Sequence, residues 1–69
     1  MLHYSINITW SDEDGTFVAT CPELPGLSAF GDTPDEAARE AHVAAQGFIK
    51  IMQADGDEIP EPLKAVAAA

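Results

Sequence analysis

The sequence predicts an α+β domain in which one long helix packs on one face of an antiparallel sheet of three or four strands. Three observations support this class. Apolar and polar residues alternate near the start, an Asp-rich turn ending in Gly15 follows, and a helix with signals at both ends occupies residues 33–56. A period of two predicts strands, and apolar spacing of three and four predicts a helix. The expected element order is β-β-β-α-β.

Residues 3–10 alternate between apolar and polar side chains, which predicts a strand with one buried and one exposed face. The apolar set expected to face the core is Tyr4, Ile6, Ile8 and Trp10. The polar set expected to face solvent is His3, Ser5, Asn7 and Thr9. Residues 11–15 form a turn in which glycine can take a positive φ angle, and the β-branched run 16–21 completes a hairpin.

A loop and a short strand connect this hairpin to the helix. Residues 22–26 contain two prolines and a glycine, a composition that a central strand excludes. Residues 27–31 are expected to form the third strand, with Phe30 as its large side chain.

Capping residues at both ends of the predicted helix indicate where it begins and where it ends. Thr33 can cap the first free N–H groups, Pro34 suits the first helical position, and Glu36 can complete a capping box. Gly56 can close the helix in the left-handed conformation. The expected core-facing stripe comprises Ala37, Ala41, Ala44, Phe48 and Ile51, with Ala38, Ala45, Ile49 and Met52 beside it.

This helix is longer than three short strands require, at roughly 33 Å for about 22 residues. Its second half therefore predicts self-association through Phe48, Ile49, Ile51 and Met52. A domain of this size buries little of its surface and is commonly reinforced by association. We expect a homo-oligomer, either a dimer or a tetramer.

The last residues follow two prolines, at positions 60 and 62, that end any helix. Residues 57–69 are expected to be a linker followed by either a short fourth strand or a frayed tail. The chain, residues 1–69, is expected to be a single domain with its core in 3–63 and no DNA-binding domain.

The charge balance is strongly acidic, with 12 Asp and Glu against 3 Lys and Arg and a net charge of −9. It argues against direct nucleic-acid binding, which requires cationic groups, and against an anionic membrane surface. It fits a basic protein partner; the alternative is that it only keeps a small protein soluble. The sequence contains no apolar run long enough to span a membrane and no recognisable signal peptide, so we expect the protein in the cytoplasm.

The sequence shows no catalytic constellation, metal site or cofactor motif, and we expect a protein that is not an enzyme. His42 is expected to be a partly buried structural residue, and Cys21 a small buried one. Residues 12–14 do not have EF-hand spacing and are expected to form a solvated turn. The residues available to a partner are the polar face, Ser5, Asn7 and Thr9, and the acidic turn, Asp12, Glu13 and Asp14.

An ordered set of short motifs resembles the N-terminal domain of the HicB-type antitoxin family. The set is Tyr4-Ser5-Ile6, Glu13-Asp14-Gly15, Pro22-Glu23-Leu24-Pro25-Gly26, the helix start at residues 31–37, and Pro60-Glu61-Pro62. Together these motifs extend over residues 3–63.

The resemblance implies a partial ribonuclease H-like fold and a function. Antitoxins of this family mask HicA, a small basic toxin with a double-stranded-RNA-binding-like fold that cleaves messenger RNA through a histidine. Ribonuclease H chemistry needs carboxylates on the first strand to hold metal ions, and residues 3–10 contain no Asp or Glu. The expected function is therefore a non-catalytic antitoxin, and the alternative is a stand-alone homo-oligomeric domain without a toxin.

Overall fold

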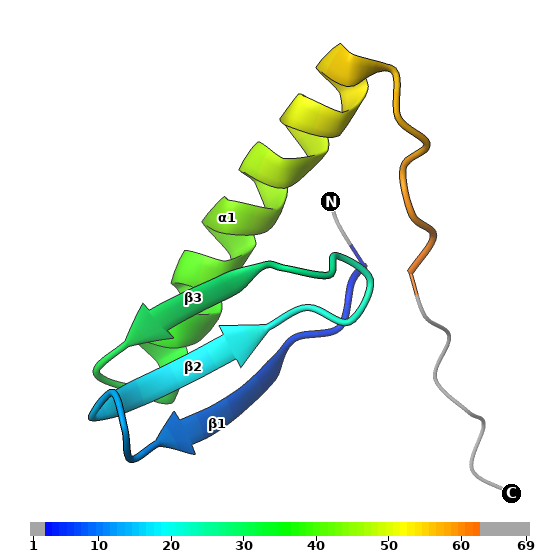
Figure 1. Ribbon diagram of the computed structural model, residues 1–69. Helices are drawn as coiled ribbons and strands as arrows, with labels where there is room; N and C mark the ends of the chain where they lie inside the picture. The colour runs from blue at the N-terminus through cyan, green and yellow to red at the C-terminus, as the bar shows by residue number, and fades with distance from the viewer. Residues whose placement is uncertain (1–2, 63–69) are drawn as a thin grey trace, which may run out of the picture.

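The computed structural model describes residues 3–62, which form an antiparallel sheet with one long helix packed on one face (Figure 1). The strands β1 (Asn7–Ser11), β2 (Thr16–Thr20) and β3 (Ser28–Gly31) lie in the order β1-β2-β3, and α1 spans Pro34–Asp55. The predicted α+β class is confirmed. The expected fourth strand at 63–69 lies outside the described residues.

The β1–β2 hairpin is closed by hydrogen bonds within its turn. The N–H of Gly15, at φ 63°, donates to the carbonyl of Ser11 at 2.8 Å. The Ser11 hydroxyl donates to Asp14 Oδ2 at 3.1 Å. This turn sets a register in which Trp10 lies opposite Phe17.

The first strand begins at Asn7, four residues later than the alternation predicted. The reason lies in the backbone upstream. The N–H of Ser5 donates to the carboxylate of Glu23 at 3.1 Å, instead of joining a strand ladder. The alternation of apolar and polar side chains therefore begins upstream of the strand. In that upstream segment the backbone N–H of Ser5 bonds to Glu23 in the loop after β2, and not to a neighbouring strand.

The loop after β2 folds into two successive turns. Leu24 N–H donates to the Cys21 carbonyl at 3.0 Å, and Leu27 N–H donates to the Leu24 carbonyl at 3.1 Å. These turns bury Leu24 and Leu27, while Pro22 and Pro25 remain exposed. The proline-rich loop therefore supplies core residues.

Both ends of α1 have the predicted caps, Thr33 and Gly56, but the reciprocal bond from the Glu36 side chain that would complete a capping box is absent from the described residues. Thr33 is extended, at φ −129° and ψ 159°, and its hydroxyl accepts a hydrogen bond from Glu36 N–H at 3.1 Å. At the other end Gly56 is left-handed at φ 76°, and the N–H groups of Gly56 and Asp57 reach back to Gln53 and Met52. These contacts satisfy backbone groups that a helix end leaves free.

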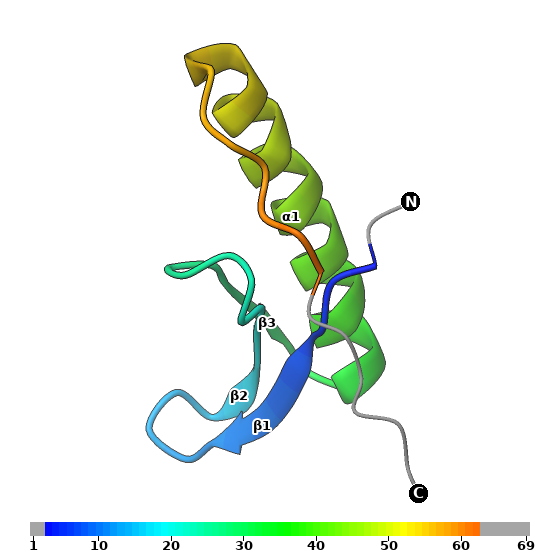
Figure 2. The same cartoon turned by 90° about the vertical axis from the view of Figure 1, so that its right-hand side faces the viewer.

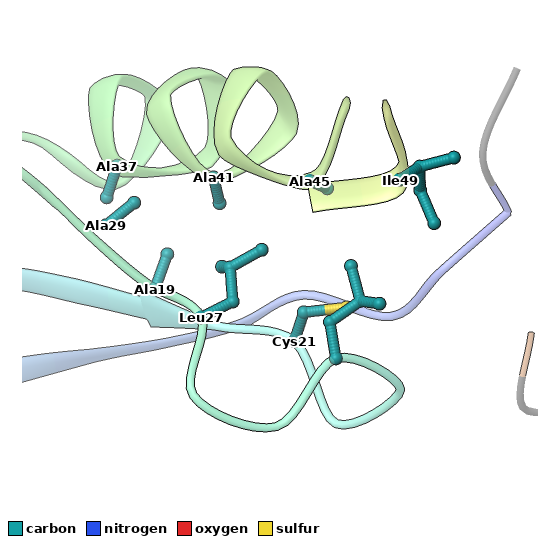
Figure 3. Packing of buried hydrophobic residues seen from close by; sticks show 9 residues of the cluster. Ala19, Cys21, Leu27, Ala29, Ala37, Ala41, Ala45 and Ile49 are labelled. Carbon is teal, nitrogen blue, oxygen red and sulfur yellow. The ribbon is translucent and has the colours of Figure 1, made fainter. Parts of the chain in front are cut away.

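The core is built around a row of helical residues spaced four apart, three alanines and one isoleucine. Figure 3 shows this row pointing toward Ala19, Cys21, Leu27 and Ala29, with which it forms the core. The row consists of Ala37, Ala41, Ala45 and Ile49. Ile51, predicted within the core-facing stripe, is instead 63% exposed. It lies about 200° around the helix from Ile49, because each residue adds about 100°.

The second half of α1 extends beyond the sheet (Figure 1), and one side of it joins the core of the same chain. Tyr4, Ile6 and Ile59 pack against the core. The Tyr4 hydroxyl donates to the carbonyl of Pro60, so the two end segments are joined. Figure 1 and Figure 2 show residues 57–62 turning back after the end of α1, in the direction of the N-terminal segment. The additional helix length therefore contributes to the core of a single chain.

Two glycines provide a matched test of the close contact between helix and sheet. A Cβ on Gly31 would lie 2.4 Å from Ala37 N, whereas one on Gly47 would have no described atom within 4 Å. We predict that Gly31→Ala lowers the free energy of unfolding by about 1–3 kcal/mol. The control, Gly47→Ala, is expected to raise it by about 0.5–1 kcal/mol. Urea denaturation followed by circular dichroism measures both, and equal effects would contradict the packing described.

Candidate protein-binding site

Carboxylates gather at one end of the molecule, where the β1–β2 turn lies beside the connection from β3 to α1 (Figure 1). A hydrogen bond of 2.7 Å from the Thr16 hydroxyl to the Gly31 carbonyl joins the two segments. We call this region the acidic end, and it comprises Asp12, Glu13, Asp14, Asp32, Asp35 and Glu36. All but Glu36, which is half-buried, are exposed. Neither segment contains a Lys or Arg to balance these charges.

Trp10 stands at the acidic end with its ring held in place. Its indole N–H donates to Asp12 Oδ1 at 2.7 Å. Its ring meets the ring of Phe17 edge-on, with centroids 5.0 Å apart and planes at 71°. Trp10 nevertheless remains 52% exposed. Both neighbours limit the rotamers of an indole that is still accessible to a partner.

The exposure of Trp10 corrects the prediction that it faces the core. Its register with Phe17 does place it on the helix side of the sheet. However, α1 begins beside β3 and packs mainly on that strand, while β1 lies farthest from it in strand order. The helix therefore leaves this end of β1 uncovered within residues 3–62.

The predicted polar face divides between two environments. Asn7 and Thr9 are exposed on β1, on the side of the sheet away from α1. Ser5 precedes β1 and is half-buried, with its N–H bonded to Glu23. The acidic turn, Asp12 to Asp14, lies beyond the end of the strand. The structure therefore separates the polar strand face from the acidic turn and leaves Ser5 outside both.

Glu23 is a buried carboxylate that sequence reasoning missed. It is 7% exposed, and both of its oxygens accept the Ser5 N–H. The Cys21 thiol donates a hydrogen bond to Glu23 Oε1, with 3.6 Å between the sulfur and the oxygen. A glutamate between a proline and a leucine in a loop has no local signal of burial. It occupies the unspecified position of the Pro-x-Leu-Pro-Gly motif, and that motif does not indicate its contacts.

Two side chains near Glu23, Cys21 and Tyr4, have raised pKa values. Burial raises the pKa of the Cys21 thiol, and backbone hydrogen bonds from Leu24 and Glu23 offset part of this rise. Burial also raises the pKa of Tyr4, with further contributions from the negative charges of Cys21 and Glu23. Cys21 is buried, as expected, and its thiol is poorly suited to act as a nucleophile.

The two histidines lie on exposed surface. His42, expected to be partly buried, is exposed on α1, with its Nε2 atom 3.2 Å from Gln46 Nε2. That prediction was wrong because the buried alanine next to it, Ala41, lies about 100° around the helix from His42. His3 is exposed, as predicted.

Within residues 3–62, no three His, Cys, Asp or Glu side chains come together in a way that could hold a metal ion, and no pocket is found. None of the helices in this part of the chain combines the length and apolarity needed to cross a membrane.

The four residues proposed for self-association differ in their availability. Ile49 belongs to the core of its own chain at 9% exposed, and Phe48 and Met52 pack partly against that core. Ile51 is the residue of this set that remains exposed to a partner.

Comparison with known proteins places these features in a family context. Residues 4–68 match the family model described as "HicB_like antitoxin of bacterial toxin-antitoxin system". The chain is also similar to UPF0150 protein Ta0767 of Thermoplasma acidophilum, with 34% identity over 59 residues. That alignment covers 86% of this chain and 84% of the relative. No solved structure matches the chain.

Removing the Glu23 carboxylate tests its role in holding the N-terminal segment. We predict that Glu23→Ala lowers the free energy of unfolding by about 1–3 kcal/mol, because the Ser5 N–H loses its acceptor. Glu13→Ala, at an exposed turn position, is expected to change it by less than about 0.5 kcal/mol. Thermal and urea denaturation compare the two, and similar losses would contradict the buried contact.

Tyr4 is the single tyrosine of the chain, so its ionisation can be followed by absorbance at the phenolate band. We predict a midpoint above the ordinary pKa of 10.0 in the native protein and a lower one in urea. Because the native pKa is raised, the stability linked to Tyr4 is complete below pH 10.0 and is lost as pH rises through the native pKa. Coincident midpoints in the two states would contradict the assignment, and Tyr4→Phe provides the blank.

Proposed function

The chain belongs to the HicB-like antitoxin family of bacterial toxin–antitoxin systems, and from this premise we propose that it binds and masks a small basic toxin of the HicA type. Family membership is the observation that carries the proposal. The match extends over residues 4–68, which include the sheet, the helix and the loop around Glu23. In this function the protein acts by binding, and it needs no cofactor.

Charge supports a basic partner. The net charge is −9, and the acidic end concentrates six carboxylates on two adjacent segments. A toxin that cleaves messenger RNA must attract phosphates with cationic side chains. The acidic end would attract those same side chains and steer the two proteins together. Masking would then follow from occupying the surface that RNA needs, in the cytoplasm where messenger RNA is translated.

Trp10 supports a specific anchor within this surface. Tryptophan is enriched among the interface residues that contribute most to affinity. The indole is already restrained by Asp12 and Phe17, so less conformational entropy is lost when a partner binds. A cation over the ring face would also be attracted by the π system. We therefore propose that the toxin binds at Trp10 and at the neighbouring acidic turn, Asp12, Glu13 and Asp14.

The polar strand residues contribute less to this proposal. Asn7 and Thr9 carry no charge, and they face the side of the sheet away from α1. The Ser5 N–H is already committed to Glu23. Within the set expected from sequence, the acidic turn is thus the part best suited to a basic toxin.

We predict that this chain forms a complex with a small basic protein encoded beside its gene and relieves that protein's block of cell-free translation. The Asp12→Asn/Asp14→Asn variant should weaken the complex about tenfold at low salt, mainly by slowing association. Trp10→Ala should weaken it about thirtyfold. Calorimetry and stopped-flow kinetics measure the two effects.

The matched control is Asp57→Asn/Glu58→Gln, which removes the same charge just beyond the other end of α1. It should leave the affinity close to that of the unchanged chain. Equal weakening by both charge variants would show that binding depends on net charge alone. Absence of any complex, with no relief of translation, would contradict the toxin-masking function itself.

A further inference from the structure

One face of the sheet carries no charge in a protein that is otherwise strongly charged. The chain has 15 charged residues, 12 acidic and 3 basic, and none of them lies in β1, β2 or β3. Alternate residues of the strands point away from α1, opposite the face that contributes Ala19 and Ala29 to the core. We call this surface the charge-free face, and it comprises Asn7, Thr9, Ser11, Thr16, Val18, Thr20, Ser28 and Phe30.

The centre of the charge-free face is apolar. Thr9, Val18 and Phe30 lie opposite one another across the three strands. Phe30 is 51% exposed, and Val18 beside it is half-buried. A phenylalanine ring exposed beside a valine on the sheet surface leaves apolar area that association could bury.

We propose that two copies of this chain pack against each other through the charge-free face, sheet on sheet, as a symmetric dimer. This proposal is independent of the toxin-binding function and uses a different surface. Val18 lies in the middle strand and would occupy the centre of the interface. In such packing the two sheets lie about 10 Å apart with their side chains between them.

The distribution of charge favours a second copy of this chain as the partner on the charge-free face. Two copies each carrying −9 repel one another, and the repulsion is weakest where the facing surfaces hold no carboxylates. A basic partner would gain no electrostatic attraction from this face. The charge that suits a toxin therefore lies at the acidic end, and the surface suited to self-association lies on the sheet.

The polar residues of the face also suit a symmetric partner. In a two-fold dimer the same patch must be complementary to itself. Ser and Thr hydroxyls both donate and accept hydrogen bonds, so identical side chains can pair across the axis. Five of the eight positions are Ser or Thr. The hydroxyls of Ser11 and Thr16 already donate within the chain, to Asp14 and Gly31, so Thr9, Thr20 and Ser28 carry this argument.

The helix offers a weaker alternative. Val43 and Ile51 are each 63% exposed on α1. However, the exposed surface of this helix also contains Glu40, Lys50 and Asp55. Two copies facing each other through α1 would therefore bring charged side chains together.

Sedimentation equilibrium of the full chain, from micromolar to millimolar concentration, tests the proposal. The unchanged chain should be dimeric. Phe30→Glu should raise the dimer dissociation constant about thirtyfold, because the interface would then bury a carboxylate from each copy. Ile51→Glu is the matched control, an exposed apolar residue changed to the same charge, and it should remain dimeric. Circular dichroism verifies that each variant keeps its helix.

Thr9→Glu provides a second disruption on a different strand, in case Phe30→Glu loses its fold. A monomeric unchanged chain would overturn the proposal, and it would indicate that the face is covered by the chain itself or left open. Dissociation by Ile51→Glu with retention by Phe30→Glu would place the interface on the helix instead. Phe30→Glu should still bind the basic toxin, so loss of the dimer and loss of toxin masking can be told apart.

Discussion

The structure depends on the close approach of α1 to the sheet. Gly31 has no room for a Cβ beneath the backbone of Ala37, and the helix contributes alanine at three of its four most buried positions. Small residues bring the two layers together without large side chains between them. The core therefore gains its larger members, Leu24, Leu27 and Ile49, farther along the helix, where the loop after β2 covers it. This arrangement places α1 over β3 and leaves the far end of β1 exposed with Trp10.

The segregation of charge follows from the same architecture. Strands that pack under a helix on one side need apolar side chains there, and in this chain they also carry no charge on the other side. The carboxylates lie instead in the β1–β2 turn, the β3–α1 connection, α1, the segment after it and, for Glu23 alone, the loop after β2. Turn and connection meet at one end because antiparallel strands bring the ends of neighbouring elements together. Two surfaces of opposite character therefore stand on one small domain, one acidic and one neutral.

Several predictions from sequence succeeded because short-range physics decides them. Thr33 and Gly56 mark the two ends of the helix, as predicted, because capping depends on backbone groups within one turn. The hairpin formed where Asp14 and Gly15 suit a tight turn. The family resemblance, drawn from motifs in order, agrees with the matched family model. The acidic turn was recognisable for the same reason, because three consecutive carboxylates in a turn have little alternative to solvent.

The remaining features depended on contacts between distant parts of the chain. The sequence alone determined the element types, the helix boundaries, the acidic balance and the family. The tertiary structure decided that β1 starts at Asn7, that Glu23 is buried, and that Ile51 and Trp10 are exposed. Each of these depends on where α1 and the loop after β2 lie across the sheet, and periodicity within one segment does not record that placement. The periodicity of a segment indicates which side chains lie on the same face of a strand or helix. Whether that face is buried depends on which other parts of the chain cover it.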